Sequence, residues 1–370
     1  MSIRVATFNV ENLFNRPIAM NMQDWAESQP ILDDNAKITS LLNQETYSPA
    51  DKAEILRLLE KNGLDKTRPS NKYLELRQIR GQLLKHPKGK PAEVVAKGRA
   101  SWVGWVELKK ESIADDAIRN TARVIADVNP DILMMVEVEN RPALLRFHES
   151  ILKPLMEKLN QEPYDHIMVI QGNDRREINV GILSRRPILR MVSHVDDNTD
   201  AGTPVFSRDC PEYYFGLDDG TELILLPNHL TSKGSDTTGK RRRVQSAAAK
   251  KIYEKLCKTH TRIILGGDWN DFPASGALDP VLKETNLKDA MSLAAYKGKY
   301  PGTYRGATEK EKLDYLLLSP DLAKRVSAVD VNRKGYYAPT KWESYGNITK
   351  DTKDRYQASD HHCLFADIDL

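Results

Sequence analysis

Short apolar runs that end abruptly in polar residues recur along the chain and predict a series of buried strands. The run from Asp131 to Glu137 is continuously apolar between its two acids, as expected of a strand buried on both faces. Comparable runs lie at 2–8, 166–170, 178–183, 222–229, 263–265, 312–319 and 363–368. Stretches with helical periodicity separate several of these runs, at 117–128, 142–159 and 239–257. This pattern predicts a fold that combines buried strands with helices.

Residues 15–110 interrupt the alternation of strands and helices. Ser48 and Pro49 are a favourable start for a helix, and apolar residues then repeat at helical spacing until Gly63. A second helical pattern covers residues 73–84. We therefore predict a mainly helical insertion at 15–110.

The end of this insertion contains a basic, proline-broken loop at 85–91 and a strand or ordered edge at 101–108. The second of these segments carries Trp102 and Trp105, for which core packing is the favoured interpretation because aromatic side chains are mostly buried. The insertion has no compact set of acids and histidines, so we predict that it interrupts a single catalytic domain spanning 1–370.

Composition indicates a globular protein. The chain has 370 residues, of which 40% are hydrophobic and 29% charged, and its net charge of +3 permits a polyanionic partner without requiring one. Its three cysteines are scattered and suit neither a disulfide framework nor a zinc site. No apolar run reaches membrane-spanning length, and residues 3–8 read as a strand instead of a signal peptide. We expect a cytoplasmic protein that does not contact membranes.

Acids, amides and histidines gather at the ends of the predicted strands. In isolation each is explained by an ordinary turn, but a core needs none of them there, and together they predict one convergent polar site. These residues are Asn9, Glu11, Glu137, His229, Asp268, Asn270, Asp314, Asp360 and His361. Oxygen ligands dominate this set, which favours a hard cation such as Mg²⁺ or Mn²⁺ over zinc. Such a cation suits phosphoryl chemistry.

Six segments, in order, resemble the motifs of the endonuclease/exonuclease/phosphatase superfamily. They are Thr7–Asn12, Val136–Glu139, Asn228–Leu230, Gly267–Asn270, Leu313–Tyr315 and Ser359–His361. The resemblance spans most of the chain but excludes the insertion and most of the loop 336–357. It implies an α+β fold, a four-layer αββα sandwich of two mostly antiparallel sheets flanked by helices, with the site at one edge of the sheets.

The resemblance also implies a role for each residue. Glu137 would bind the metal with support from Asn9, Glu11 and Asp360, while Asp268 and Asn270 would position or deprotonate the attacking water. His229 would serve the leaving group, and His361, oriented by Asp314, would stabilise the transition state. The residues expected to contact the substrate phosphate are Arg176, Asn228 and Lys233.

These features predict a metal-dependent phosphodiester hydrolase that cleaves DNA or RNA. The basic segments 85–90 and 240–243 favour nucleic acid as the substrate, and the insertion is also a possible site for a protein partner. Two alternatives stay open: a phosphomonoesterase or lipid or inositol phosphatase with the same site, and an inactive binding module. The family often has an acid where Asn179 stands, which leaves the pairing of that residue open.

Overall fold

The computed structural model describes residues 2–13, 19, 25–109, 115–174, 176 and 178–370. Contacts divide the chain into two compact units, each with a hydrophobic core of its own. The main unit comprises residues 1–14 and 113–370, and the inserted unit comprises residues 15–112. The predicted limits of the insertion, Asn15 and Lys110, lie outside the described residues.

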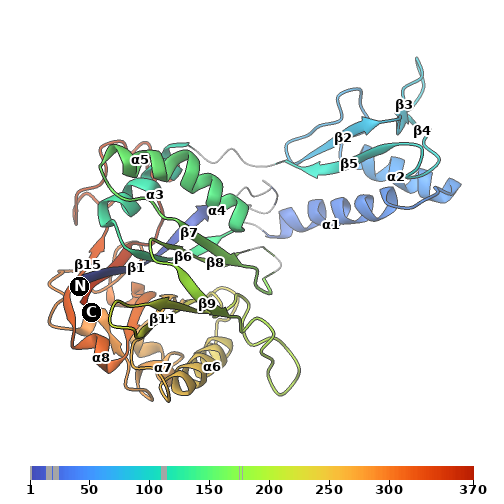
Figure 1. The fold of residues 1–370 in the computed structure, drawn as a ribbon. Coiled ribbons are helices and arrows are strands. Elements are labelled where there is room, and N and C mark those ends of the chain that lie inside the picture. Colours follow the sequence, from blue (N-terminus) through green and yellow to red (C-terminus); the bar gives the residue numbers. More distant parts are fainter. Residues whose placement is uncertain (1, 14–18, 20–24, 110–114, 175, 177) are drawn as a thin grey trace. The chain divides into compact units, whose positions relative to one another are not determined.

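Two six-stranded sheets form the centre of the main unit (Figure 1). The strands of the first sheet, in spatial order, are β15 (Val326–Asn332), β16 (Cys363–Asp369), β1 (Ser2–Leu13), β6 (Ile132–Val138), β8 (Asn179–Ser184) and β7 (His166–Ile170). Those of the second sheet are β13 (Lys288–Asp289), β14 (Asp314–Leu318), β12 (Ile263–Asp268), β11 (Glu222–His229), β10 (Glu212–Gly216) and β9 (Ile188–Val192). The pairs β1–β6 and β11–β12 are parallel and the other neighbours are antiparallel.

Helices lie on the outer faces of these sheets. Residues 141–158 form one helical stretch with a π-helical segment, His148–Leu152, between α4 and α5. The described helices of the main unit are α3 (Asp115–Val128), α4 (Arg141–Phe147), α5 (Lys153–Lys158), α6 (Lys240–Leu256), α7 (Asp279–Leu282), α8 (Pro320–Ala323) and α9 (Lys353–Tyr356).

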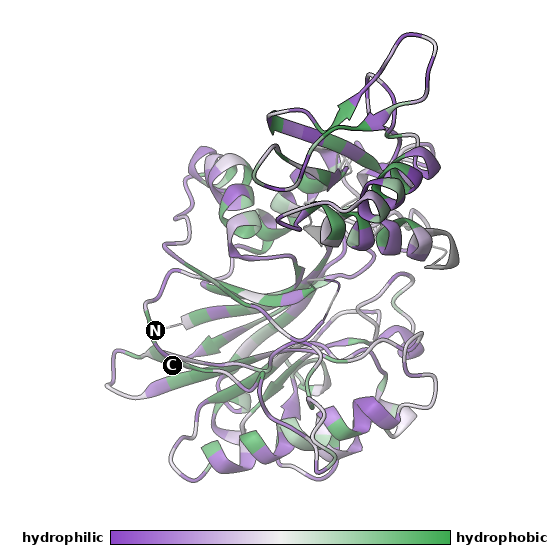
Figure 2. Ribbon diagram, turned by 90° about the vertical axis from the view of Figure 1, so that its right-hand side faces the viewer, coloured by the Kyte–Doolittle hydropathy of each residue, from purple (hydrophilic) through white to green (hydrophobic). Residues whose placement is uncertain are grey.

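The period-two alternation of the strands explains the layers. In β1, Ile3 and Val5 join the core between the sheets, whereas Ala6 and Phe8 join the core under α3 and α4. The second sheet shows the same alternation. In β11, Leu223 and Leu225 pack between the sheets, whereas Ile224 and Leu226 pack against α6 and α7. Hydrophobic colouring accordingly concentrates on the strands in Figure 2. The predicted four-layer αββα fold is confirmed.

The inserted unit combines two helices with four strands. They are α1 (Trp25–Leu42), α2 (Pro49–Lys61), β2 (Leu74–Arg80), β3 (Leu84–Lys85), β4 (Glu93–Val94) and β5 (Val103–Leu108). The predicted start of α2 is confirmed, since the side chains of Ser48 and Asp51 form a reciprocal capping box.

The predicted helix at 73–84 is wrong, because this segment contains β2, which pairs with β5. Its Leu, Glu, Arg and Gln residues are good helix formers, but the cross-strand pairing and the burial of Leu74 and Leu76 decide the structure. None of the described helices is both long enough and apolar enough to cross a membrane.

Candidate active site

Three neighbouring strands place His229, Asp268 and Asp314 side by side at one edge of the second sheet. His229 at the end of β11 is in register with Asp268 at the end of parallel strand β12. Asp268 is in turn in register with Asp314, the first residue of antiparallel strand β14. All three side chains are buried. The apolar runs that form these strands therefore fix the spacing of the polar row.

His361 joins this row from the segment that leads into β16. Its Nδ1 lies 2.8 Å from Oδ2 of Asp314, which also accepts a 2.7 Å hydrogen bond from Oγ1 of Thr303. Its Nε2 lies 3.8 Å from Oδ2 of Asp268. The structure thus brings Asp314 and His361 together, with Nε2 of His361 facing Asp268.

Asp268 is held by amide groups from both sheets. Nδ2 of Asn9 donates to Oδ2 of Asp268 over 3.1 Å, which connects β1 to β12. The backbone N–H of Asn270 donates to Oδ1 over 2.8 Å, and its Nδ2 donates to Oδ2 over 3.2 Å. These bonds fix the orientation of the carboxylate.

Three more carboxylates gather near the first sheet. The backbone N–H of Asp360 donates to Oε2 of Glu11 over 2.7 Å, and the backbone N–H of Glu11 donates to Oδ1 of Asn9. Oε1 of Glu137 lies 3.8 Å from Nε2 of His229. Burial, followed by the neighbouring charges of Asp360 and Glu137, raises the pKa of Glu11 to about 8.

Two groups of residues in this region are candidates for holding a hard divalent cation. The raised pKa of Glu11 reports carboxylates that repel one another in a buried setting, and a cation would relieve that repulsion. Asp268, Asp314 and His361 also lie close enough together to hold an ion. However, Nδ1 of His361 is already bonded to Asp314, and an imidazolium is a poor ligand. Glu11, Glu137 and Asp360, with Asn9, stay the residues predicted from the sequence to bind the metal.

The two histidines of the site carry different charges. Burial alone would lower the pKa of His361, but the carboxylates of Asp314 and Asp268 raise it well above its usual value. Burial lowers the pKa of His229 well below its usual value, and the nearby positive charges of Arg208 and His361 lower it further. The site therefore has one cationic and one neutral imidazole at neutral pH.

Asp268 has a pKa suited to proton transfer. Complete burial raises the pKa of Asp268 to about 7, and the charge of Asp314 acts in the same direction while that of His361 opposes it. A carboxyl group whose pKa lies near the working pH is an effective general base.

The sequence analysis missed Arg208. Its side chain is 97% buried, with Nη2 at 3.5 Å from Nε2 of His229 and Nε at 3.3 Å from Oδ2 of Asp174. The segment from Phe206 to Asp209 forms no strand or helix, so periodicity gave no signal for this arginine. This guanidinium adds a fixed positive charge beside His229.

The residues predicted to bind phosphate are less tightly grouped. Arg176 forms an ion pair with Asp174 and lies within the electrostatic influence of Glu137. Lys233 is partly exposed and lies 3.7 Å from Asp271, and its side chain has no recorded contact with the catalytic row. Asn228 is fully buried and donates to the backbone carbonyl of Leu226. Their phosphate contacts stay predictions.

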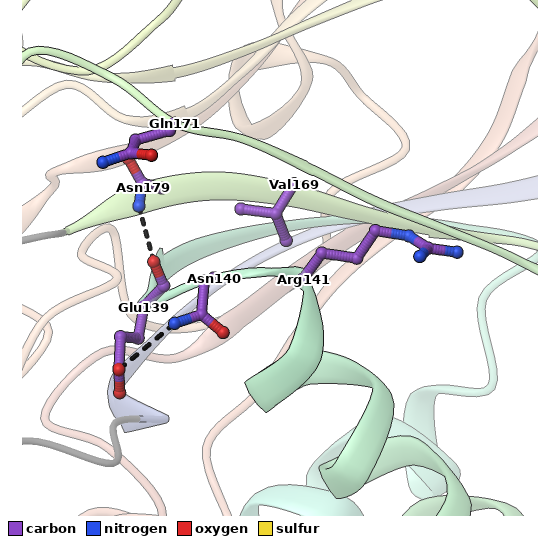
Figure 3. A pocket seen from close by; sticks show the side chains of 6 residues that line it. All are labelled: Glu139, Asn140, Arg141, Val169, Gln171 and Asn179. Carbon is purple, nitrogen blue, oxygen red and sulfur yellow. Dashed lines mark hydrogen bonds between the residues drawn. The ribbon is translucent and has the colours of Figure 1, made fainter.

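A polar pocket of about 210 Å³ lies beyond the end of β6. It is lined by Glu139, Asn140, Arg141, Val169, Gln171 and Asn179 (Figure 3). Nδ2 of Asn179 donates to the backbone carbonyl of Glu139 over 2.6 Å, and its Oδ1 accepts from the N–H of Gly172. Asn179 thus ties two loops together, and its recorded partners include no histidine.

Backbone strain concentrates at this site. Glu11, Glu137 and Asn270 have φ angles of 35°, 65° and 51°, in a region that side-chain-bearing residues rarely adopt. Such conformations persist where surrounding structure imposes them, and they cluster at functional sites. Three separate strand ends share this property here.

Comparisons with known proteins identify a family for this chain. Residues 112–361 match the model of the Endonuclease/Exonuclease/phosphatase family. None of the curated proteins matches the chain in sequence. Similar solved structures include truncated TDP2 of Caenorhabditis elegans, at 18% identity over 69% of this chain and 90% of that chain, with a TM-score of 0.45.

Two further structures show the same degree of likeness. The human Nocturnin catalytic domain with bound sulfate is 15% identical over 68% of this chain and 86% of that chain, with a TM-score of 0.47. The mannosyl-6-phosphatase of Bacteroides thetaiotaomicron is 17% identical over 69% of this chain and 91% of that chain, with a TM-score of 0.47.

The fold and site define a phosphoesterase. The family match covers more than half of the chain, so the protein belongs to the endonuclease/exonuclease/phosphatase family. Members of this family are divalent-metal-dependent hydrolases of phosphoesters. The matched region begins after nearly all of the inserted unit, which the family model does not cover.

Proposed function

We propose that the protein hydrolyses phosphodiester bonds of nucleic acid by in-line attack of water. The observation that carries this proposal is the buried row of His229, Asp268 and Asp314, completed by His361. It combines a carboxylate with a pKa near neutrality, a charged imidazole and a neutral imidazole within a few ångströms. Hydrolysis of a phosphodiester needs a base for water and positive groups where charge develops.

Asp268 takes the proton of the attacking water in this mechanism. Its carboxylate is oriented by Asn9 and Asn270, so the water is held in one direction. The side chain of Asn270 is itself fixed by donation to the backbone carbonyl of Leu230 over 3.0 Å. Because these hydrogen bonds already hold the carboxylate in place, Asp268 can accept the proton without a change in the orientation of its side chain, which is the basis of electrostatic preorganisation.

Positive and hydrogen-bonding groups surround the position of the phosphoryl oxygens. The Nε2–H of His361 faces Asp268 and donates to a phosphoryl oxygen placed there, while Asp314 holds the ring and its charge. His229 is neutral, so it acts through a hydrogen bond on the leaving-group side and not as a strong acid. Arg208 contributes a charge on the same side.

Glu11, Glu137, Asp360 and Asn9 would hold the cation, for which we propose Mg²⁺ or Mn²⁺ because oxygen donors dominate. When bound, such a cation neutralises charge on the phosphate and lowers the pKa of coordinated water.

Nucleic acid is the substrate class that the rim of the site fits best. The ring of Tyr304 lies against that of His361 with centroids 4.7 Å apart, and the guanidinium of Arg305 lies over Tyr304. Aromatic and arginine side chains next to a phosphate site suit a sugar or base joined to the scissile phosphate, together with a neighbouring phosphate. The basic segment 240–243 offers less support than predicted, because Arg242 is buried in ion pairs with Asp236 and Asp271.

A substrate panel tests the proposal. Single-stranded DNA, duplex DNA, RNA, mononucleotides, sugar phosphates and inositol phosphates are incubated with Mg²⁺, Mn²⁺ or EDTA. We expect cleavage of a nucleic acid with either metal and none with EDTA. His361→Asn should lower the rate by about 10²-fold or more, whereas His260→Asn, outside the site, should not. Turnover confined to phosphomonoesters would reject the proposed substrate class.

We also propose a reducing compartment such as the cytoplasm. Cys210, Cys257 and Cys363 are free thiols, and Cys257 is exposed. An exposed free thiol persists more readily where glutathione and thioredoxin keep cysteines reduced.

A further inference from the structure

The charges of the inserted unit are segregated along its chain. Residues 25–62, which hold both helices, include seven acidic and four basic residues. Residues 65–109, which hold all four described strands, include eleven lysine and arginine residues and four acidic residues. The strand-bearing part thus has a net charge of +7, compared with +3 for the whole chain.

Several of these cations are exposed and lack an acidic partner. Arg77 contacts Glu75 and Glu107, but none of the cations around the β3–β4 hairpin is matched in this way. Four exposed side chains lie more than 4.0 Å from every carboxylate in the described part of the chain: Arg80, Lys85, Lys88 and Lys90. Clustered like charges repel one another, and a polyanion relieves that repulsion.

The two tryptophans of this unit differ in environment. Trp102 is fully buried, and its Nε1 donates to the hydroxyl of Tyr47 over 2.8 Å, so the expected core packing is correct for this residue. Trp105 is 42% exposed and lies on β5. Core packing therefore does not account for Trp105.

Strand register places Trp105 among arginines. Arg77 of β2 is directly opposite Trp105, and Arg80, after a bulge, is opposite Val103. Val103 and Trp105 are two residues apart, so they share one face of the strand. Leu76 and Val106 occupy the opposite, buried face. The outer face of the β2–β5 ribbon, whose strands are adjacent in Figure 1, thus carries the exposed indole of Trp105 opposite Arg77 and one pair away from Arg80. Glu75 and Glu107 lie on the same face and pair with Arg77, which leaves Arg80 as the arginine without an acidic partner among the described residues.

We propose that Arg77, Arg80, Lys85, Lys88, Lys90 and Trp105 act as one surface and that this surface binds single-stranded nucleic acid. The cations contact backbone phosphates, and the indole stacks on an unpaired base. A single strand is favoured over a duplex because its bases are free to stack on an exposed aromatic ring. This proposal rests on the proposed function and names the form of nucleic acid that the protein binds. Binding at this surface requires neither the metal nor hydrolysis, so it can be measured separately.

Binding of full-length protein to a fluorescein-labelled oligothymidylate, measured by anisotropy in EDTA, tests the proposal. The quadruple variant R80Q/K85Q/K88Q/K90Q should bind at least about tenfold more weakly at 0.1 M salt. The slope of log affinity against log salt should fall by about 2 to 3, since each phosphate contact to a single strand contributes about 0.7. A matched control removes four exposed, unpaired lysines of the main unit: K251Q/K258Q/K288Q/K324Q. It should bind like the wild type.

Stacking is tested separately. Trp105→Ala should weaken binding about tenfold, whereas Trp105→Phe, which keeps an aromatic face, should retain most of the affinity. Equal losses in the two quadruple variants, or no loss in Trp105→Ala, would overturn the proposal, as would tighter binding of duplex than of single strand.

Hydrolysis of bis(p-nitrophenyl) phosphate, a small diester, separates this proposal from the proposed function. All of these variants should hydrolyse it at the wild-type rate. Binding without any nuclease activity would contradict only the proposed function. Nuclease activity with binding unaffected by the variants would contradict only the proposal for this surface.

Discussion

Asp268 combines two properties that rarely occur together in an aspartate. Both of its oxygens accept hydrogen bonds, yet complete burial raises its pKa to about 7. The bonds fix the position of the carboxylate, and the raised pKa allows it to exchange a proton near neutral pH. A general base benefits from both.

Asp268→Asn should therefore lower the hydrolytic rate by about 10²- to 10⁴-fold, since the amide keeps the shape of the carboxyl group but accepts no proton. Steady-state kinetics on the best substrate measure the rate, and circular dichroism shows whether the variant is folded. Asp330→Asn, which changes an exposed carboxylate on β15, is the matched control and should leave the rate unchanged. Wild-type turnover in a folded Asp268→Asn protein would contradict the assigned role.

The residues of the site were predictable to different degrees. Asp268, Asp314 and His229 were found because each terminates or begins an apolar strand, which is visible in the chain. Arg208 was missed because it lies in an irregular segment, where nothing in the sequence distinguishes a buried arginine from a solvated one. Its importance comes from tertiary contacts with His229 and Asp174.

At the scale of elements, β11 and β12 approach so closely that one position requires glycine. Gly267 has φ of +128°, and a Cβ there would lie 2.0 Å from the backbone oxygen of Asn228. Backbone atoms of a central strand have no room to move away.

Gly267→Ala should consequently reduce the free energy of unfolding by about 3–5 kcal/mol. Gly220→Ala is a useful control, because Gly220 also has a positive φ, +79°, but its Cβ would meet nothing within 4 Å. That variant should lose only about 1–2 kcal/mol. Similar losses in both variants, measured by urea denaturation, would show that steric contact is not the main cause.

The connection between β9 and β10 contains a pH-dependent contact. Nε2 of His194 lies 2.9 Å from Glu212, and its Nδ1 lies 2.9 Å from Asp197. Burial lowers the pKa of His194, but these two carboxylates outweigh burial and raise it. A raised pKa in the folded state means that the imidazolium stabilises the fold below the unfolded value of 6.5, and that this stabilisation is lost as pH rises through the folded value.

Replacement of His194 by Gln should thus cost about 1 kcal/mol at pH 5.5 and less at pH 8.5. Denaturant titrations of both proteins at the two pH values measure the difference. An equal cost at both pH values would mean that the charge of the imidazole makes no contribution.

Among the elements, buried strands were easier to predict than exposed ones. Central strands such as β6 and β12 are continuous apolar runs. In β2 and in the edge strand β15, most residues are exposed or partly exposed, and charged side chains interrupt the pattern. The pairing of β2 with β5 joins residues about 30 positions apart, so a local window does not reveal it.

At the scale of the whole molecule, each of the two units has core residues of its own. We propose that the inserted unit, with a core that includes Leu59, Leu64 and Trp102, unfolds independently of the main unit. Each unit is large enough to have its own cooperative transition.

Calorimetry of Leu59→Ala tests this proposal. Leu59 is fully buried, so its truncation should cost about 2–5 kcal/mol and lower the transition of the inserted unit alone. Leu225→Ala, in the core between the sheets of the main unit, should lower the other transition. A single transition that shifts as a whole in both variants would show that the units unfold together.

The position of β1 has a consequence for the timing of assembly. This first strand pairs on one side with β6 and on the other with β16, whose residues are separated from it by some 360 positions. A growing polypeptide on the ribosome therefore presents an unsatisfied strand edge until almost all of the main unit has been translated. Asp360 and His361 come immediately before β16, so a nascent chain lacks both of these proposed site residues until nearly all of the main unit has been translated.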